Sequence, residues 1–294
     1  MQELAGCSHR SIDVRLAPQH PLNMRSIETL HRQKKTGKVS DKWDSYLPVY
    51  DRLLGPRKDD AIDILEIGIQ NGGSLEIWSQ FFVNARRLVG CDINPRCAGL
   101  KYSDKRISVV VGNANESGIR ARIQHIAAKY DFIIDDGSHT SEDIFQSFAL
   151  YFSMVKPGGI YVVEDTHTLY WPRYGGDLHS PRTATSFFKL FADLVNYEHW
   201  KESSTIEDLF GRFFKTSSLP EELSAGWVDS IEFRNSMIII RKARTATHAK
   251  VGKRLITGTE AMVEESILKD SGRSTTGARP PKGPLKRLRK LWKG

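Results

Sequence analysis

The chain has 294 residues and a hydrophobic content of 39%, which is enough to bury a full core in one large domain with additions or in two small ones. No apolar run reaches the roughly 18 residues of a membrane-spanning helix, and the first residues lack the apolar region of a secretion signal. Three cysteines, Cys7, Cys91 and Cys97, are too few for a disulfide framework, and Cys91 is expected to be a buried thiol. These features predict a cytoplasmic protein.

The net charge of +8 belongs to the end of the chain. Residues 241–294 carry 15 Lys and Arg against 4 Asp and Glu, which leaves 28 basic and 31 acidic side chains in the remainder. The globular part is therefore mildly acidic, and no nucleic-acid partner is expected. In residues 284–294, leucines and a tryptophan share one helical face opposite the bases. Such an end either contacts the inner face of a membrane peripherally or is a disordered, solubilising tail.

The predicted elements begin after residues 1–35, which show no sustained period and are interpreted as an irregular arm or short helices. Residues 38–54 are expected to form a helix that is either a hydrophobic lid or part of a ligand pocket. Strands are then predicted at 62–67, 87–91, 107–111, 132–134 and 160–163, with Pro157-Gly158-Gly159 turning the chain into the last of these. Helices are predicted at 74–82, 119–128 and 186–195, and after Thr140, which forms a capping-box pattern with Asp143. The runs 231–233 and 237–240 predict a closing hairpin.

This alternation predicts an α/β fold. The expected architecture is a doubly wound, Rossmann-like, seven-stranded and mostly parallel sheet with an antiparallel edge strand. An N-terminal helical arm and lid would occupy residues 1–55, the α/β domain residues 56–244, and a basic, partly disordered tail residues 245–294.

Polar residues gather where two of the predicted strands end. Asp135-Asp136-Gly137-Ser138-His139 follows the strand at 132–134, and Glu164-Asp165 follows the strand at 160–163. In open α/β sheets, ligands bind in the crevice at the carboxyl ends of the strands. Carboxylates and a histidine gathered there are suited to hold a hard metal ion and to move a proton.

The glycine loop Glu66-x-Gly68-x-x-x-Gly72-Gly73 departs from the spacing of a dinucleotide site, and a plain strand-to-helix turn explains it equally well. Asp92 ends the second strand, where an acid can accept hydrogen bonds from ribose hydroxyls. Glu66 would repel a pyrophosphate but suits a cationic ligand. Because S-adenosylmethionine carries a ribose, a sulfonium and an ammonium but no phosphate, these acids favour that cofactor over NAD.

From Lys38 to Gly176 the sequence resembles the class I S-adenosylmethionine-dependent methyltransferases. More narrowly, it is similar to the magnesium-dependent sugar O-methyltransferases of macrolide and rhamnosyl-glycoside biosynthesis, a group that includes cephalosporin-hydroxylase-type proteins. The matching segments are Ser40–Trp43, Leu65–Gly68, Gly72–Leu75, Gly90–Ile93, Ile134–His139, Lys156–Gly159, Val163–Asp165 and Tyr170–Gly176. The resemblance therefore assigns residues 56–244 to a methyltransferase domain.

The resemblance also implies a role for individual residues. The magnesium ligands it implies are Asp136, Glu164 and Asp165, and the general base is His139. The cofactor-binding residues are Glu66, Gly68, Gly72, Ser74, Asp92, Asn113 and Asp135. Asn113 replaces an acid found in many relatives, but its amide can still bond an adenine edge. Asp135 as a hydrogen-bond acceptor beside the helix and Asp165 as a loop cap are the structural alternatives, and His167 and His179 are expected to be surface or packing residues.

The implied reaction is methylation of a sugar hydroxyl in a glycoside, glycolipid or glycosylated natural product. Mg²⁺ coordinated by two neighbouring hydroxyls would lower their pKa, and His139 would take the proton before the oxygen attacks the sulfonium methyl in line. Residues 170–186 form either an acceptor-binding loop or a packed Ω-loop. Two alternatives stay open: methylation of a phenolic or antibiotic hydroxyl, and a non-catalytic cofactor-binding partner of another enzyme. The oligomeric state, a homo-oligomer included, is left open.

Overall fold

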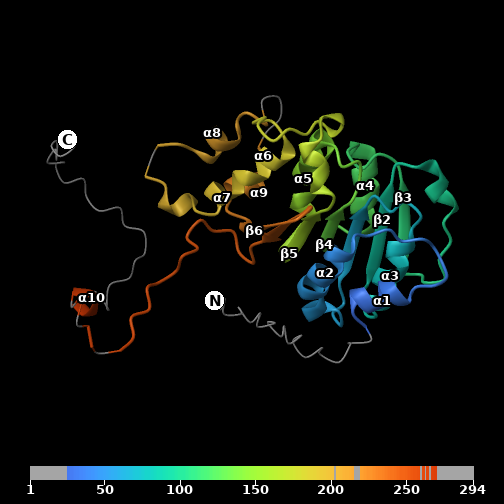
Figure 1. The fold of residues 1–294 in the computed structure, drawn as a ribbon, viewed down its shortest axis with the longest axis horizontal. Coiled ribbons are helices and arrows are strands. Elements are labelled where there is room, and N and C mark those ends of the chain that lie inside the picture. Colours follow the sequence, from blue (N-terminus) through green and yellow to red (C-terminus); the bar gives the residue numbers. More distant parts are fainter. Residues whose placement is uncertain are drawn as a thin grey trace, which may run out of the picture.

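The computed structural model describes residues 25–201, 203–214, 219–258, 260–261, 263–264 and 266–269. Seven strands form one sheet in the order β3-β2-β1-β4-β5-β7-β6 (Figure 1). Their bounds are β1 (Asp63–Ile67), β2 (Arg87–Asp92), β3 (Ile107–Val111), β4 (Tyr130–Asp135), β5 (Val155–Val163), β6 (Val228–Arg234) and β7 (Met237–Lys242). The first five strands are parallel, whereas β7 is antiparallel to both β5 and β6. The predicted Rossmann-like, mostly parallel sheet with an antiparallel edge is confirmed.

Helices cover both faces of this sheet. The longer ones are α1 (Ile27–Gln33), α2 (Leu47–Leu54), α3 (Gly73–Phe81), α4 (Ser117–Ile126), α5 (Ser141–Tyr151) and α6 (Ala184–Lys189). Four-residue and five-residue helices follow as α7 (Phe191–Leu194), α8 (Ile206–Phe210), α9 (Glu221–Ser224) and α10 (Ser266–Lys269). One apolar core lies between the sheet and α1 to α3, and a second lies between the other face and α4 to α9.

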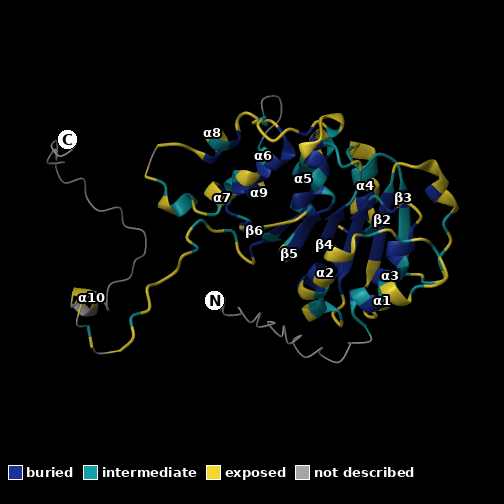
Figure 2. Ribbon diagram, viewed as in Figure 1, coloured by how far each residue is buried: buried dark blue, intermediate teal, exposed yellow. Residues whose placement is uncertain are grey.

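The alternation of strand β1 explains how one strand serves both cores. Ile64 packs in the core beneath α1 to α3, whereas Leu65 and Ile67 pack in the opposite core. All five residues of β1 are buried, as expected for a central parallel strand covered on both faces. The middle of the sheet, around the labelled strands β2 and β4, is dark blue in Figure 2. Because alternate side chains point to opposite faces, Glu66 lies on the same face as Ile64, towards α3.

Two predicted boundaries were wrong. Strand β5 begins at Val155, so Pro157-Gly158-Gly159 lies inside the strand and does not form a turn before it. The pairing register with β4 shifts at this place, between Tyr130 and Phe132, and such an irregularity accommodates a proline that cannot donate to the ladder. The predicted helix at 186–195 is divided at Leu190 into α6 and α7.

The helix predicted over residues 38–54 is also shorter than expected. Residues 38–43, here called the strap, form neither helix nor strand and precede a 3₁₀ turn (Asp44–Tyr46) that leads into α2. The amide of Gly73 at the start of α3 donates to the carbonyl of Val39 at 3.0 Å. A Cβ at this glycine would lie 2.3 Å from that carbonyl oxygen, so the close approach of the strap requires glycine.

Several predictions concern residues outside the described part of the chain. These are the arm up to residue 24 with Cys7, and the basic end at 284–294. Within the described part, Cys91 is a buried free thiol, as predicted, and no helix is long and apolar enough to cross a membrane.

Candidate functional site

A cavity of about 430 Å³ opens at the carboxyl ends of the central strands. Its walls come from the strap, the glycine loop after β1, the end of β2 and the loops after β4 and β5. A smaller cavity of about 170 Å³ adjoins it, with Gly68, Asp92 and Gly137 lining both. The predicted crevice at the strand ends therefore exists, and it has two compartments.

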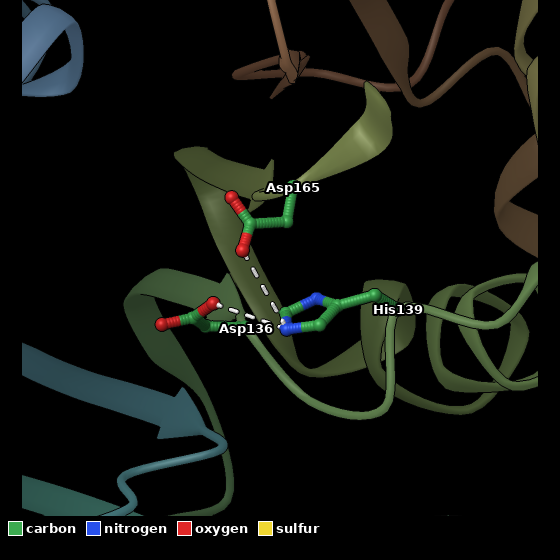
Figure 3. Close-up of side chains that lie close together, drawn as sticks. All are labelled: Asp136, His139 and Asp165. Carbon is green, nitrogen blue, oxygen red and sulfur yellow. Dashed lines mark ion pairs between the residues drawn. The ribbon is translucent and has the colours of Figure 1, made fainter. Parts of the chain in front are cut away.

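Two carboxylates and an imidazole meet in the larger cavity (Figure 3). The Nε2 atom of His139 lies 3.8 Å from Oδ1 of Asp136 and 3.7 Å from Oδ2 of Asp165. His139 and Asp165 both have left-handed backbones, with φ of 58° and 54°. Such conformations cost about 1–3 kcal/mol in non-glycine residues and cluster at functional sites. The loops after β4 and β5 therefore hold strained residues that bring these side chains together.

Glu164 lies beside this group, but its carboxylate is buried deeper. Its Oε1 atom accepts hydrogen bonds from the Tyr50 hydroxyl and from Lys42 Nζ, the latter at 2.8 Å. The three acids expected to bind magnesium thus line one cavity. Among the described residues, Asp136, His139 and Asp165 have ligand-type atoms that all lie within 4.8 Å of one another.

Lys42 is the site residue that the sequence reasoning missed. Its side chain is 3% exposed, and its ammonium lies 2.5 Å from Asp136 Oδ2, 2.8 Å from Glu164 Oε1 and 3.2 Å from Glu66 Oε1. The matching segment Ser40–Trp43 contained this lysine, but spacing alone gave no signal for a contact with residues more than 90 positions away.

The charges of this cluster oppose one another. Burial raises the pKa of Asp136 and Glu164 above the ordinary carboxyl range, although the Lys42 ammonium offsets part of the shift. Burial alone would lower the pKa of Lys42, but the carboxylates Asp136, Glu164 and Glu66 outweigh it and raise that pKa. All three pKa values are raised, which favours neutral carboxyl groups on Asp136 and Glu164 but a charged ammonium on Lys42. We take the ammonium to be charged, because three carboxylates surround it.

The glycine loop contacts the acid loop directly. Gly68 has a φ of +84°, and a Cβ there would lie 1.9 Å from the carbonyl oxygen of Asp136. Asp92 shapes the same loop, since its carboxylate accepts hydrogen bonds from the amides of Ile69 and Gln70 at 2.9 and 2.7 Å. Gly72 has a φ of +79°, another conformation that favours glycine.

The remaining residues expected to bind cofactor are placed differently. Glu66 is 1% exposed, lines neither cavity, and accepts hydrogen bonds from Ser74 Oγ at 2.6 Å and Trp78 Nε1 at 3.1 Å. Ser74 lines the larger cavity and Asn113 the smaller one. Asp135 also lines the smaller cavity, but its Oδ2 accepts from the Tyr161 hydroxyl at 3.0 Å. Burial raises the pKa of Asp135 to about 6.

His167 packs, as predicted. Its Nδ1 shares a hydrogen bond with Ser236 Oγ, and its ring lies edge-on to Trp43 and Trp171, with centroids 5.9 and 5.0 Å away. Trp43 and Trp171 are 57% and 42% exposed. Aromatic surface therefore borders the loop that carries Asp165.

Comparison with known proteins agrees with this geometry. Residues 58–184 match the model of the family described as Rhamnosyl O-methyltransferase/CmcI. This segment belongs to that family. It contains β1 to β5 and every acid discussed above, whereas Lys42 and the strap precede it.

Several named proteins are similar to this chain over part of their length. Demethylmacrocin O-methyltransferase of Streptomyces fradiae is 34% identical over 179 residues, which cover 56% of this chain and 44% of the relative. The 8-demethyl-8-alpha-L-rhamnosyl tetracenomycin-C 2'-O-methyltransferase of Streptomyces olivaceus is 28% identical over 225 residues, covering 73% of this chain and 55% of the relative. The chain spans about half the length of these relatives.

Among solved structures, the MycE methyltransferase of the mycinamycin biosynthetic pathway, in complex with Mg, SAH and mycinamycin VI, matches with a TM-score of 0.60 and 26% identity. The match covers 74% of this chain and 54% of MycE. A second MycE crystal form gives a TM-score of 0.62 over 86% of this chain and 60% of MycE.

Proposed function

We propose that the protein is an S-adenosylmethionine- and magnesium-dependent O-methyltransferase that acts on a sugar hydroxyl of a glycosylated small molecule. One observation carries the proposal: the glycine loop and the acid-and-histidine cluster face a common cavity, joined where Gly68 abuts Asp136. A methyl donor on the glycine loop would therefore lie beside the groups that prepare its acceptor. The names of the relatives, which methylate rhamnosyl and olivosyl groups, support the sugar as acceptor.

The acid cluster suits a divalent ion. The ammonium of Lys42 contacts three carboxylates, those of Glu66, Asp136 and Glu164, and a fourth, that of Asp165, lines the same cavity as Lys42. This excess of buried negative charge and hard oxygen donors is what Mg²⁺ prefers. We assign Asp136, Glu164 and Asp165 as its ligands. The ion would act as a Lewis acid and lower the pKa of a neighbouring sugar hydroxyl.

The other compartment suits S-adenosylmethionine. Asp92 lies at the wall shared by the two cavities, where a ribose can bond its carboxylate. Asn113, in the smaller cavity, offers its amide to an adenine edge. Glu66 does not contact the ligand itself. Its buried carboxylate orients the side chains of Ser74 and Lys42. The cofactor would supply the methyl group on its sulfonium.

His139 is proposed as the general base. Its Nε2 lies in the larger cavity, 3.8 Å from Oδ1 of Asp136 and 3.7 Å from Oδ2 of Asp165, where it can take a proton from a bound hydroxyl. Nε2 would take the proton of the acceptor hydroxyl; the bound cofactor would supply the methyl group to that oxygen and, with its S–CH3 bond broken and the electron pair left on sulfur, would leave as S-adenosylhomocysteine. Trp43 lines the larger cavity and is 57% exposed, so its ring can stack on the apolar side of a sugar.

The finer expectations stay predictions. They are the division of the chain near residues 55 and 244, a cytoplasmic location, peripheral membrane contact through residues 284–294, and a homo-oligomeric state. The membrane contact concerns residues outside the described part of the chain.

Calorimetry with S-adenosylhomocysteine and Mg²⁺ tests the two-compartment site. The wild-type protein should bind both ligands, and Asp136→Asn should lose the metal while it keeps most of its affinity for S-adenosylhomocysteine. Asp44→Asn, which changes an exposed carboxylate on the neighbouring 3₁₀ turn, is the matched control and should bind both ligands as the wild type does. Absence of binding of S-adenosylhomocysteine to the wild type would rule the proposal out.

A further inference from the structure

The segment from Lys42 to Tyr50 contacts all three acids that we assign to the metal. Lys42 binds Asp136 Oδ2 and Glu164 Oε1. Glu164 Oε1 also accepts from the Tyr50 hydroxyl. These contacts join residues that are 94 to 122 positions apart.

Asp165 is held from the same segment. Its Oδ1 atom accepts hydrogen bonds from Trp43 Nε1 at 2.9 Å and from the Tyr46 hydroxyl at 2.8 Å. The same hydroxyl oxygen accepts from the Asp165 amide at 3.1 Å and lies 2.6 Å from Oγ of Ser236, on the turn between β6 and β7. The strained backbone of Asp165 is thus fixed through its amide and its carboxylate together.

In each acid these bonds end on a single oxygen. The second oxygen of Asp136, Oδ1, and that of Asp165, Oδ2, face His139. A carboxylate with one oxygen fixed can no longer rotate freely, so the direction of its other oxygen is fixed as well. Outer contacts of this kind orient the ligands of metal sites and usually change metal affinity when they are removed.

We propose that Lys42, Tyr46 and Tyr50 are positioning residues of the metal centre, each selecting which carboxylate oxygen is left for the ion. The inference rests on the proposed function and extends it to a segment that precedes the family match at 58–184. Lys42 also lessens the repulsion between the acids, so that they stay close together before an ion arrives.

The two tyrosines make the inference testable with minimal change. Both are 1% exposed, and their hydroxyls bond carboxylates. Tyr130 is equally buried, but its hydroxyl donates to the backbone carbonyl of Ile123 at 2.9 Å, and it lies at the opposite end of β4. Tyr130→Phe is therefore a matched control that loses one buried hydrogen bond far from the site.

The experiment compares Tyr46→Phe, Tyr50→Phe and Tyr130→Phe with the full wild-type chain. Binding of Mn²⁺, the probe for the metal, is measured from the electron paramagnetic resonance signal of the free ion, and binding of S-adenosylhomocysteine by calorimetry. The first two variants should bind Mn²⁺ at least about tenfold more weakly, the typical effect of losing an outer contact. Tyr130→Phe should match the wild type, and the Kd of S-adenosylhomocysteine should change less than twofold throughout.

Two results would overturn the inference and leave the proposed function standing. One is an unchanged Mn²⁺ affinity in both Tyr46→Phe and Tyr50→Phe. The other is an equal loss of Mn²⁺ and S-adenosylhomocysteine binding, which would indicate a general loss of structure. A wild-type protein that binds no Mn²⁺ would overturn the metal centre of the proposed function, and the inference with it.

Discussion

Replacing Lys42 by methionine should destabilise the metal-free protein strongly. Methionine keeps most of the length of the apolar stem but removes the ammonium, so the carboxylates of Glu66, Asp136 and Glu164 lose their shared cation. Glu66 and Glu164 have side chains only 1% and 2% exposed, so water cannot replace the lost contact. Breaking a buried ion pair by removing one partner costs about 3–5 kcal/mol. In a protein of this size that corresponds to a fall in Tm of roughly 6–20 °C.

The loss should also depend on pH. Without the ammonium, the buried carboxyl groups of Asp136 and Glu164 have pKa values raised further above those of the unfolded chain. A group whose folded-state pKa is raised contributes stability below its unfolded pKa, and this is lost as pH rises through the folded value. The difference in unfolding free energy between wild type and Lys42→Met should therefore be larger at pH 8 than at pH 6.

Urea unfolding in the presence of a chelator measures both effects. Lys35→Met changes an exposed lysine just before the strap and should leave the unfolding free energy unchanged. Adding Glu164→Gln to Lys42→Met should recover part of the loss, because one uncompensated negative charge is removed. If Lys42→Met unfolds within about 1 kcal/mol of the wild type at pH 8, well below the cost of breaking a buried pair, the reasoning about this cluster is refuted.

Two further predictions concern the loop after β1 and the start of β4. Gly68→Ala should abolish binding of S-adenosylhomocysteine in calorimetry, because its Cβ would collide with the carbonyl of Asp136. Retained affinity would show that the loops after β1 and β4 can separate. Burial alone raises the pKa of Asp131, but hydrogen bonds from Lys156 and Arg57 outweigh it and lower that pKa. Asp131→Asn should thus cost about 2 kcal/mol at pH 7, and the deficit in thermal unfolding should shrink as the pH falls below about 4; a deficit independent of pH would contradict this.

Much of the site was predictable because its residues come directly after the carboxyl ends of two strands. The apolar run Phe132–Ile134 and the acids behind it predicted where β4 stops, and β5 ends in the same way before Glu164. Parallel neighbours bring their carboxyl ends to one edge of a sheet, so local patterns were sufficient to place His139 near the acids.

The direction of individual side chains was harder to predict. Glu66 follows the alternation of β1 and points with Ile64 towards α3, where Ser74 and Trp78 bind it. The sequence shows this alternation. Because Glu66 lies near the carboxyl end of the predicted strand, however, we expected its side chain to contact the ligand. Asp135 likewise turns to Tyr161, whereas Asp136 reaches the cavity.

The contribution of the strap could not be derived from local patterns. Lys42 meets Glu164 across 122 positions of sequence, and its burial depends on how the strap crosses the start of α3 at Gly73. Periodicity describes one element at a time, so an interaction set by tertiary packing leaves no trace in it.

The central claim is that a metal-assisted base on the loop after β4 prepares a sugar hydroxyl for methylation. Its most direct test is transfer of labelled methyl from S-adenosylmethionine to a panel of rhamnosyl- and olivosyl-bearing natural products, with magnesium or with a chelator, by wild type and His139→Ala. We expect label on a sugar oxygen, and we expect it to be lost with the chelator and in His139→Ala. Transfer that is undiminished without metal or without the imidazole, or label on the aglycone, would contradict it.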